Sequence, residues 1–397
     1  MPQKLMILGA GPYQLPGIQK AVRLGCHVIT IDNLPGNVGH RFSHESHNCS
    51  TTDLDGVLEI AKRIGLDGIC SFSSDVAVPT VGYVAEQLGL SAVPYRAARI
   101  MANKASFRVF MKVKGLSYPD FVVATTFDEL KDAALSIPGA VVIKPVDSSG
   151  SRGVVRLEAF GEAGARQAFD NAKAFSRTGA VCLESFLAGV EIGGDAVFSK
   201  GRILFCAITC KHRSGFIVTG HSLPPIISEK AISSVKEALA ATCQALGYTD
   251  GPLNFDVIID GDIAIIIEMS PRNGGNGIPA VISRATGYDV ERQTLLIALG
   301  QAPEPVPSAT MGGAGSVVFG SPSAGLLRSV ADKTTLKRRV PEVFELFLAK
   351  RPGDRVEAFV HNGNMIGYAL FDCPRPSDYD KIAARIHRAL ELAVDEG

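Results

Sequence analysis

Two acidic residues and an arginine stand close together in the stretch from 254 to 275, NFDVIIDGDIAIIIEMSPRNGG. Asp256 and Glu268 lie in apolar segments on either side of the turn residues 260–262, a pattern that predicts a β-hairpin. Burying carboxylates without a partner is costly, so we expect a cation beside them. Carboxylates are ligands that Mg²⁺ prefers, and Arg272 follows at once, so the stretch favours a metal and phosphate site. Two acids alone would favour a solvated hairpin end.

The register of this hairpin decides whether the acids can share a ligand. In an antiparallel pair, Asp256 and Glu268 lie on one face only if the numbers of paired residues sum to an even value. We therefore predict a three-residue loop, 260–262, whereas a two-residue turn would place the carboxylates on opposite faces. The three-residue loop predicts that the opposite, core-packed face carries Phe255, Val257, Ile265 and Ile267.

The spacing of these residues resembles a known motif. An acid at 256, Glu268 twelve positions later and Arg272 in Glu-x-x-x-Arg resemble the magnesium hairpin of ATP-grasp enzymes, in the branch of biotin carboxylase and carbamoyl phosphate synthetase. The resemblance implies that Asp256 and Glu268 hold Mg²⁺ or Mn²⁺. The third ligand is implied at Ser270, where the family usually has Asn, with Asn273 as the alternative. Arg272 would grip a substrate carboxylate or phosphate, the alternative being a salt bridge with Glu268.

A second group of candidates surrounds a glycine-rich loop. Lys144 ends the apolar strand AVVIKP, and a buried lysine needs an anionic partner, for which we expect phosphate. The loop after it, 148–153, contains glycines that allow its backbone N–H groups to approach oxygens closely, although such a loop alone is more often a mobile turn. After Ile-Lys-Pro it resembles the phosphate-covering loop of ATP-grasp enzymes. The resemblance implies ATP contacts from Lys104, Lys144, Ser149, Gly150, Ser151 and Gly153.

Two more segments complete the implied nucleotide site. The run AVCLESFLAGVE resembles the hinge of the same enzymes, which implies that Glu184, Phe186 and Leu187 contact adenine and that Glu191 contacts ribose. The alternative is that these are exposed acids at strand ends. Residues 202–221 predict a strand, a basic turn and a strand, and Lys211 is placed to reach a transferred phosphoryl group. A surface turn is an equal alternative for Lys211.

The N-terminal region has the pattern of a doubly wound α/β layer, with a strand at 4–9, a helix and a second strand ending near Asp32. Gly9 and Gly11 match part of a dinucleotide fingerprint, but Tyr13 and Gln14 follow where the third glycine should be. We favour a domain that does not bind nucleotide. Asp75 lies in a loop that open sheets use for ligands, and a helix cap is the favoured interpretation of it.

Three regions are expected along the chain: an N-terminal α/β domain at 1–102, an ATP-grasp domain at 103–300 with a phosphate-loop subdomain at about 115–182, and a C-terminal α+β domain at 301–397. Helices are predicted at 53–64, 78–88, 229–246, 289–299 and 379–393. Short strands are predicted at 315–320, 343–350, 355–362 and 365–372.

Composition narrows the classes of partner. Equal numbers of basic and acidic residues, 40 each, give no net field that would attract nucleic acid or an anionic membrane. The eight cysteines form no CxxC pair, which fits reduced thiols in a cytoplasm, and we expect a cytoplasmic protein without a signal peptide or membrane span.

The resemblance is greatest to L-amino-acid ligases, which implies an ATP-dependent ligase that joins a carboxylate to an amine through an acyl phosphate and releases ADP and phosphate. The implied partners are small carboxylates and amines, and the implied assembly is a homodimer. A bicarbonate-using carboxylase or carbamoyl-phosphate-type enzyme is the first alternative, although CAITCKHR does not match the biotin-binding run of carboxylases. The second, more remote alternative is a non-catalytic nucleotide-binding module or a dehydrogenase.

Overall fold

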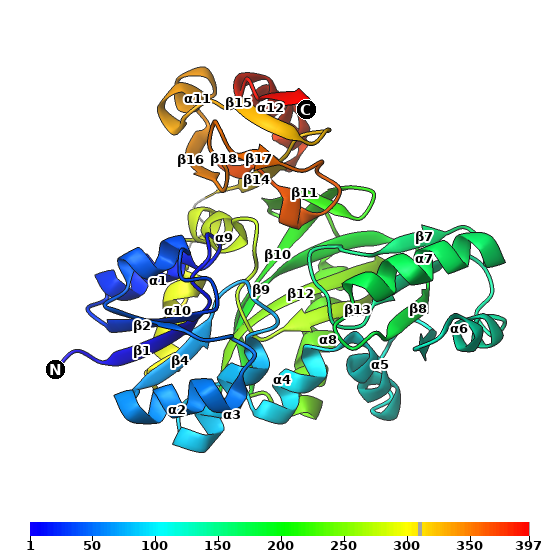
Figure 1. The fold of residues 1–397 in the computed structure, drawn as a ribbon, viewed down its shortest axis with the longest axis horizontal. Coiled ribbons are helices and arrows are strands. Elements are labelled where there is room, and N and C mark those ends of the chain that lie inside the picture. The colour runs from blue at the N-terminus through cyan, green and yellow to red at the C-terminus, as the bar shows by residue number, and fades with distance from the viewer. Residues whose placement is uncertain (309–311, 397) are drawn as a thin grey trace.

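The computed structural model describes residues 1–308 and 312–396, and its N-terminal part is a parallel sheet between helices (Figure 1). The strand order is β3-β2-β1-β4, and each neighbouring pair is parallel, as the doubly wound pattern predicted. Its elements are β1 (Lys4–Leu8), α1 (Leu15–Arg23), β2 (His27–Asp32), the 3₁₀ helix η1 (Val38–Phe42), β3 (Glu45–Asn48), α2 (Leu54–Ile64), β4 (Gly68–Ser71), α3 (Val78–Leu88) and α4 (Tyr95–Met101).

A small antiparallel sheet forms the next unit, entered through α5 (Lys104–Val113). Its strand order is β5-β8-β6-β7. The capping box of Thr126 and Glu129 fixes where α6 begins, because each side chain bonds the other's backbone N–H. The elements are β5 (Phe121–Ala124), α6 (Phe127–Ala134), β6 (Val141–Pro145), β7 (Val155–Leu157), α7 (Glu162–Phe175) and β8 (Val181–Ser185). We call this unit the lid subdomain.

The described strands of the centre and of the C-terminal part join in one sheet of eight strands, in the order β13-β12-β9-β10-β11-β14-β18-β16. The sheet thus continues across the domain boundary predicted at residue 300, because β11 before it pairs with β14 after it. The central elements are β9 (Val190–Ser199), β10 (Arg202–Ser214), β11 (Ile217–Leu223), α8 (Glu229–Leu246), β12 (Gly251–Asp260), β13 (Ile263–Ser270), α9 (Ile278–Thr286) and α10 (Val290–Ala298).

The C-terminal part adds a second, three-stranded sheet, β17-β15-β19. Its elements are β14 (Ala314–Phe319), β15 (Gly325–Ser329), α11 (Lys333–Arg339), β16 (Val343–Leu348), β17 (Arg355–Val356), η2 (Asn362–Asn364), β18 (Gly367–Asp372), η3 (Pro376–Asp378), α12 (Tyr379–Ala389) and β19 (Ala393–Glu396). The strand predicted at 355–362 is therefore wrong beyond Val356, since β17 ends there and the 3₁₀ helix η2 begins at Asn362.

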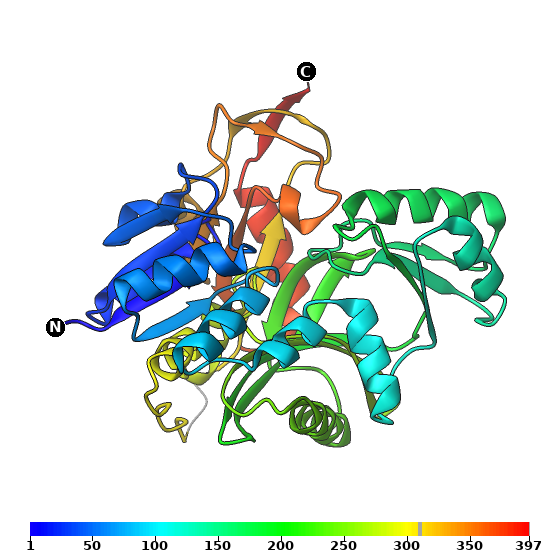
Figure 2. The same ribbon diagram turned by 60° about the horizontal axis from the view of Figure 1, so that its bottom comes forward.

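The helix α10 connects the regions. It was predicted within the ATP-grasp domain, but Leu295 and Ala298 are buried in one apolar cluster with Leu5 and Ile7 of β1. Ion pairs from Lys20 to the start of the helix, at 289 and 291, hold the same contact. Figures 1 and 2 place the N-terminal sheet and the lid subdomain on opposite sides of the molecule, with the central strands between them.

Candidate active site

The hairpin that carries the two acids is β12 and β13, and its loop is shorter than predicted. Asp260 pairs with Ile263, so the loop consists of Gly261 and Asp262 and the prediction of a three-residue loop is wrong. Gly261 has a φ of +61°, which a glycine adopts without strain and which suits a tight two-residue hairpin.

A β-bulge nevertheless brings the acids together. Val257 pairs with Ile266, but the next pair is Asp256 with Glu268, which leaves Ile267 as one extra residue on β13. The bulge changes the sum of paired numbers from odd to even. Asp256 and Glu268 are therefore directly opposite each other on one face, as the shared-site hypothesis requires.

The short loop changes which face of β13 is buried. Phe255 and Val257 are in the core as predicted, but Ile265 and Ile267 are only half-buried, because the two-residue loop shifts the alternation of β13 by one position. The residues of β13 that fill the core are Ala264, Ile266 and Met269.

Each acid of the pair has a lysine partner. Asp256 is 2.8 Å from Nζ of Lys211, and Glu268 is 3.0 Å from Nζ of Lys104. Lys211 also contacts Glu191 at 2.7 Å. Burial would lower the pKa of Lys211, but Asp256 and Glu191 raise it above its ordinary value. Burial raises the pKa of Asp256, and the charges of Glu191 and Glu268 add to this while Lys211 opposes it. A further cation near the acids is thus electrostatically favourable.

The position of Lys211 corrects one prediction. The basic residues at 211–213 do not form a turn, because β10 continues through them to Ser214. Lys211 pairs with His221 across the strands and its side chain is 8% exposed, so the surface-turn alternative is wrong. Arg213 binds the other oxygen of Glu191 at 2.5 Å.

The donor set around Asp256 and Glu268 fits Mg²⁺ in part. Mg²⁺ is commonly held by one or two carboxylates together with water and substrate phosphates, and two opposed carboxylates meet that requirement. Asn273 cannot supply the third ligand, since it is fully buried and its Oδ1 accepts a hydrogen bond from Thr294. Ser270 is also buried and lines neither cavity described below, so its role stays a prediction. Among residues 1–308 and 312–396, no cluster of three or more His, Cys, Asp or Glu is arranged for a metal.

A buried ionic network lies beside the acids. Glu184 accepts hydrogen bonds from Lys144 at 2.6 Å and from Arg108 at 2.9 and 3.3 Å. Arg108, from α5, is fully buried and also donates to the backbone oxygen of the bulge residue Ile267 at 2.8 Å. Burial alone would raise the pKa of Glu184, but Arg108 and Lys144 lower it to about 2. The anionic partner of Lys144 in this structure is therefore a carboxylate, where the sequence predicted phosphate.

The glycine-rich loop at 148–153 covers this network. Gly150, Ser151 and Gly153 all have left-handed backbone angles, with φ of +67°, +63° and +70°. Such a conformation is strained for Ser151, and its Oγ donates to the backbone oxygen of Phe216 at 2.6 Å. Lys104 donates to the backbone oxygen of Ser148, so the loop and the acid pair share one lysine.

One cavity lies under this loop, with a volume of about 140 Å³. The hinge segment 184–187 forms one wall, and Phe186 stacks on Arg156 with 3.8 Å between the guanidinium carbon and the ring centre. Both carboxylate oxygens of Glu184 are taken by the ionic network, which leaves the backbone and side chains of 185–187 to contact a ligand. The predicted residues that line the cavity are Lys104, Lys144, Ser149, Gly150, Ser151, Glu184, Phe186, Leu187, Glu191, Lys211, Asp256 and Glu268.

A second cavity of about 380 Å³ adjoins the first. The two share the loop residues 149–152, Lys211, Asp256 and Glu268, so the acid pair lies where the cavities meet. This volume is in the lower range of small-molecule sites. All three regions of the chain contribute to its wall, including Tyr13, Ser73, Asp75, His221, Asn254, Arg272, Asn276 and Asn362.

Arg272 lies in this second cavity and its partner is Asp75. Nε of Arg272 is 2.8 Å from Asp75, and NH1 is 2.8 Å from the side-chain oxygen of Asn254. The alternative pairing of Arg272 with Glu268 is therefore not formed. The helix-cap interpretation of Asp75 is also wrong, because α3 is capped at Ala77 without a side-chain bond. Burial would raise the pKa of Asp75, but Arg272 lowers it below its ordinary value.

His221 presents one defined tautomer to the cavity. Thr209 donates its hydroxyl hydrogen to the backbone oxygen of Gly193 at 3.0 Å, so it can only accept at its 2.9 Å contact with Nδ1 of His221. The proton is thus on Nδ1 and the lone pair on Nε2. Burial lowers the pKa of His221 to about 3, with Lys211 adding to the effect, so the ring is neutral at ordinary pH.

The turn after β1 does not offer a dinucleotide site. Gln14 fills it: its Oε1 accepts from the N–H of Gly11 and its Nε2 donates to the backbone oxygen of Phe72. The carboxylate of Asp32 accepts from the N–H groups of Ala10 and residue 34, so it is engaged with backbone. These contacts support an N-terminal domain that does not hold a dinucleotide.

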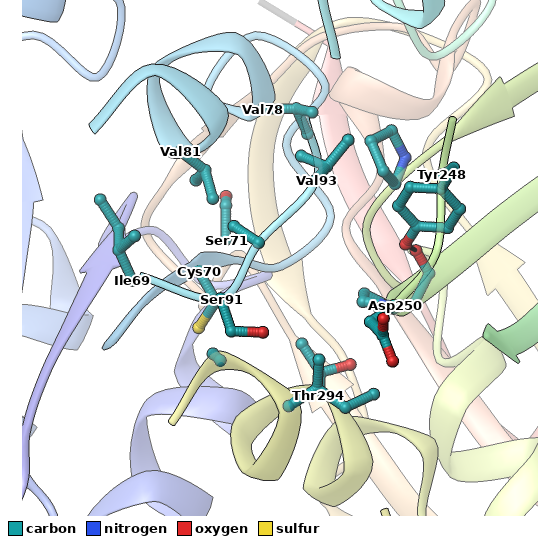
Figure 3. Close-up of a pocket in the computed structure, with 16 residues that line it drawn as sticks. Ile69, Cys70, Ser71, Val78, Val81, Ser91, Val93, Tyr248, Asp250 and Thr294 are labelled. Carbon is teal, nitrogen blue, oxygen red and sulfur yellow. Dashed lines mark hydrogen bonds between the residues drawn. The ribbon is translucent and has the colours of Figure 1, made fainter. Parts of the chain in front are cut away.

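Another cavity lies between the N-terminal domain and the centre (Figure 3). Figure 3 shows mostly apolar side chains around it, such as Val78, Val81 and Val93, together with Tyr248 and Thr294. Its volume of about 30 Å³ has room for about one water molecule, so it is a packing defect and not a substrate site.

Several site residues gave no clear signal in the sequence. Arg108 reads as one more basic position of an amphipathic helix, although it follows Lys104 by four residues and so shares its face. Asn254 and His221 are polar residues within apolar strands, which is the one signal that marks them. Asn362 lies in a segment that was predicted as strand.

No helix in the described part of the chain is both long and apolar enough to cross a membrane.

Comparison with known proteins agrees with this geometry. Residues 137–280 match the ATP-grasp domain family. The formate-dependent phosphoribosylglycinamide formyltransferase of Parasynechococcus marenigrum is 27% identical over 289 residues, which cover 71% of this chain and 74% of that protein.

Solved structures resemble the whole chain. An L-amino acid ligase from Bacillus licheniformis superimposes with a TM-score of 0.82 at 21% identity, covering 99% of both chains. N5-carboxyaminoimidazole synthetase from Staphylococcus aureus, complexed with ADP, gives a TM-score of 0.77 at 14% identity and covers 97% of this chain and 98% of that one. The resemblance to ATP-grasp enzymes is thus confirmed, and the chain is an enzyme that carries an ATP-grasp domain at residues 137–280.

Proposed function

We propose that this enzyme joins a carboxylate to an amine at the expense of ATP, through an acyl phosphate. The observation that supports this most is the position of Asp256, Glu268 and Lys211 at the junction of two cavities. The first cavity has the lysines, glycine-rich loop and hinge that suit a nucleotide. The second has room for a small acid and amine. A group that leaves the nucleotide can therefore be transferred to a carboxylate without leaving the acid pair.

The chemistry takes two displacement steps. An oxygen of the carboxylate attacks the γ-phosphorus, the bond to the bridging oxygen of ADP breaks, and ADP leaves with that electron pair. The amine then attacks the acyl carbon, the bond from carbon to the phosphate oxygen breaks, and the amine nitrogen loses a proton. Because both steps shift negative charge, the positioned cations Lys104, Lys144 and Lys211 are the groups that can stabilise it.

Asp256 and Glu268 are the residues that would hold magnesium, which supplies charge neutralisation for phosphate oxygens when bound. Arg272 is held by Asp75, Asn254 and the backbone oxygen of Asn273, which leaves one N–H of its NH2 group to donate to the substrate carboxylate. His221 is too weak a base, with a pKa of about 3, to carry the amine proton away, but its Nε2 can accept a hydrogen bond that orients the amine.

The charge of the second cavity favours substrates without a phosphate group. Three basic side chains line its wall. Lys211 and Arg272 are each paired with a carboxylate, whereas Arg152 forms no ion pair with the residues that the structure describes. Arginine commonly recognises phosphate through two parallel N–H groups, and Arg152 already uses two of its nitrogens to bond Ser149. We therefore place the substrates closer in kind to the amino acids named for the L-amino acid ligase than to the ribosyl phosphate named for the formyltransferase.

The test is a grid of small carboxylates and amines with ATP and Mg²⁺, analysed for nucleotides, phosphate and product mass. We expect ADP, phosphate and an amide in equal amounts, and only in wells that contain both an acid and an amine. Amines with and without a phosphate group form paired wells, and the unphosphorylated member should react. Release of diphosphate, or turnover with bicarbonate alone, would contradict the proposal.

A further inference from the structure

The C-terminal part reaches the second cavity through Asn362 and Gly363, at the start of η2. The side chain of Asn362 is 6% exposed although it lies in a connection between two strands. A buried polar side chain in a loop must have its hydrogen bonds satisfied, and the side chain of Asn362 finds its partner outside the C-terminal part.

The side-chain amide binds the backbone of a central strand. Nδ2 donates to the oxygen of Val218 at 2.7 Å, and Oδ1 accepts from the N–H of Val218 at 3.2 Å. The neighbouring strand β14 pairs with β11 only from Gly220 to Leu223. The side chain of Asn362 thus takes the place of a neighbouring strand at Val218. These two hydrogen bonds fix the position of the Asn362 backbone.

The fixed backbone then contacts the other two regions. Its N–H donates to the oxygen of Gly150 in the glycine-rich loop at 3.3 Å. Its oxygen accepts from the hydroxyl of Tyr13, in the N-terminal domain, at 3.4 Å. A second contact supports the first, since the ring of His361 packs edge-on against Phe175 of α7 with 6.2 Å between ring centres. The segment 361–362 therefore touches the lid subdomain twice.

The loop at 148–153 needs such contacts to stay in place. Consecutive left-handed residues at Gly150 and Ser151 are not a conformation that the chain prefers by itself. Three hydrogen bonds connect it to residues outside the lid subdomain: Asn362 donates to Gly150, Ser151 donates to Phe216, and Lys104 of α5 donates to Ser148. A Cβ built at Gly150 would meet Asn362 at 3.8 Å and no other residue within 4 Å, so Asn362 is the neighbour on that side of Gly150.

We propose that Asn362 is a positioning residue that holds the loop at 148–153 closed over the acid pair. This rests on the proposed function, because closure matters most when an acyl phosphate is present. With the loop closed, the amine is the nucleophile that reaches the acyl carbon. With the loop displaced, water attacks instead, and the acyl phosphate yields the original carboxylate and phosphate. The C-terminal part thereby links ATP use to amide formation.

The test compares Asn362→Ala with Asn364→Ala. Asn364 lies in the same turn, and its side chain bonds only to Ala358 within the C-terminal part, so it is a matched control. The measurement is the amount of amide formed for each phosphate released. We expect a ratio near one for the parent and for Asn364→Ala, and a ratio lowered up to about tenfold for Asn362→Ala, which loses two hydrogen bonds. Asn362→Asp keeps the acceptor for Val218 N–H and should give an intermediate ratio.

A second measurement does not need turnover. Trypsin cleaves after Arg152 in the loop, and mass spectrometry identifies that cut. We expect cleavage there to be faster in Asn362→Ala than in the parent and in Asn364→Ala. Equal cleavage and an equal ratio in a folded Asn362→Ala would overturn the inference and leave the proposed function intact. A parent that makes no amide with any acid and amine would overturn the proposed function, whereas faster cleavage would still support the loop contact.

Discussion

Glu268→Gln is expected to lower kcat for ATP turnover by about 100- to 1,000-fold, the range found when one preorganised charged or polar group is removed from a transition state. The amide keeps the shape of the side chain but removes one of the two opposed negative charges. It also leaves Lys104 without its carboxylate at 3.0 Å, so the lysine's charge is no longer balanced. The measurement is ADP release at saturating substrates as Mg²⁺ is varied.

Asp260→Asn is the matched control for this variant. Asp260 ends the same strand as Asp256, but it is exposed at the turn and lines neither cavity. We expect parental turnover from it. Full magnesium-dependent turnover by Glu268→Gln would show that the acid pair serves the structure of the hairpin and not its chemistry.

Arg108→Met is expected to lower the free energy of unfolding by about 3–5 kcal/mol, because removing one partner of a buried ion pair leaves the other charge uncompensated. Glu184 would keep only Lys144, and the bulge oxygen of Ile267 would lose its donor. The measurement is urea denaturation of the parent, of Arg108→Met and of Lys112→Met. Lys112 is exposed on the same helix, so its replacement should change the midpoint little.

The stability of Arg108→Met should also depend on pH differently from that of the parent. The pKa of Glu184 is lowered to about 2, so its contribution to stability is present above the ordinary glutamate pKa near 4.5 and is lost as the pH falls from there toward 2. Arg108→Met removes the largest favourable charge, which raises that pKa. Between pH 4.5 and 3, the midpoint should therefore fall less steeply for the variant than for the parent. An equal slope and an equal midpoint would contradict the network.

Local patterns in the sequence predict the elements of the site better than their partners. Helices at 78–88 and 229–246 have the predicted ends, because apolar periodicity and the glycines after them are local signals. The opposed carboxylates were predicted through a wrong register. Ile267 resembles its neighbours in type, so nothing in the sequence marks it as the bulge that restores the pairing.

Contacts between residues that are distant in the chain could not be predicted from local patterns. The need of Lys144 for an anion follows from its burial, but that Glu184 meets the need depends on how β6 pairs with β8. Arg272 and Asp75 are 197 residues apart, and the pairing of two domains decides their contact. Asn362 bonds to Val218 across 144 residues, from a segment whose local pattern suggested a strand.

An oxygen label shows directly whether the carboxylate substrate receives the γ-phosphoryl group. The acid that reacts in the substrate grid is prepared with ¹⁸O in its carboxylate and turned over once with ATP, Mg²⁺ and the amine. The proposed acyl phosphate requires that one labelled oxygen appears in the released phosphate and that the other remains in the amide. Phosphate without the label, formed together with the amide, would contradict the acyl-phosphate mechanism.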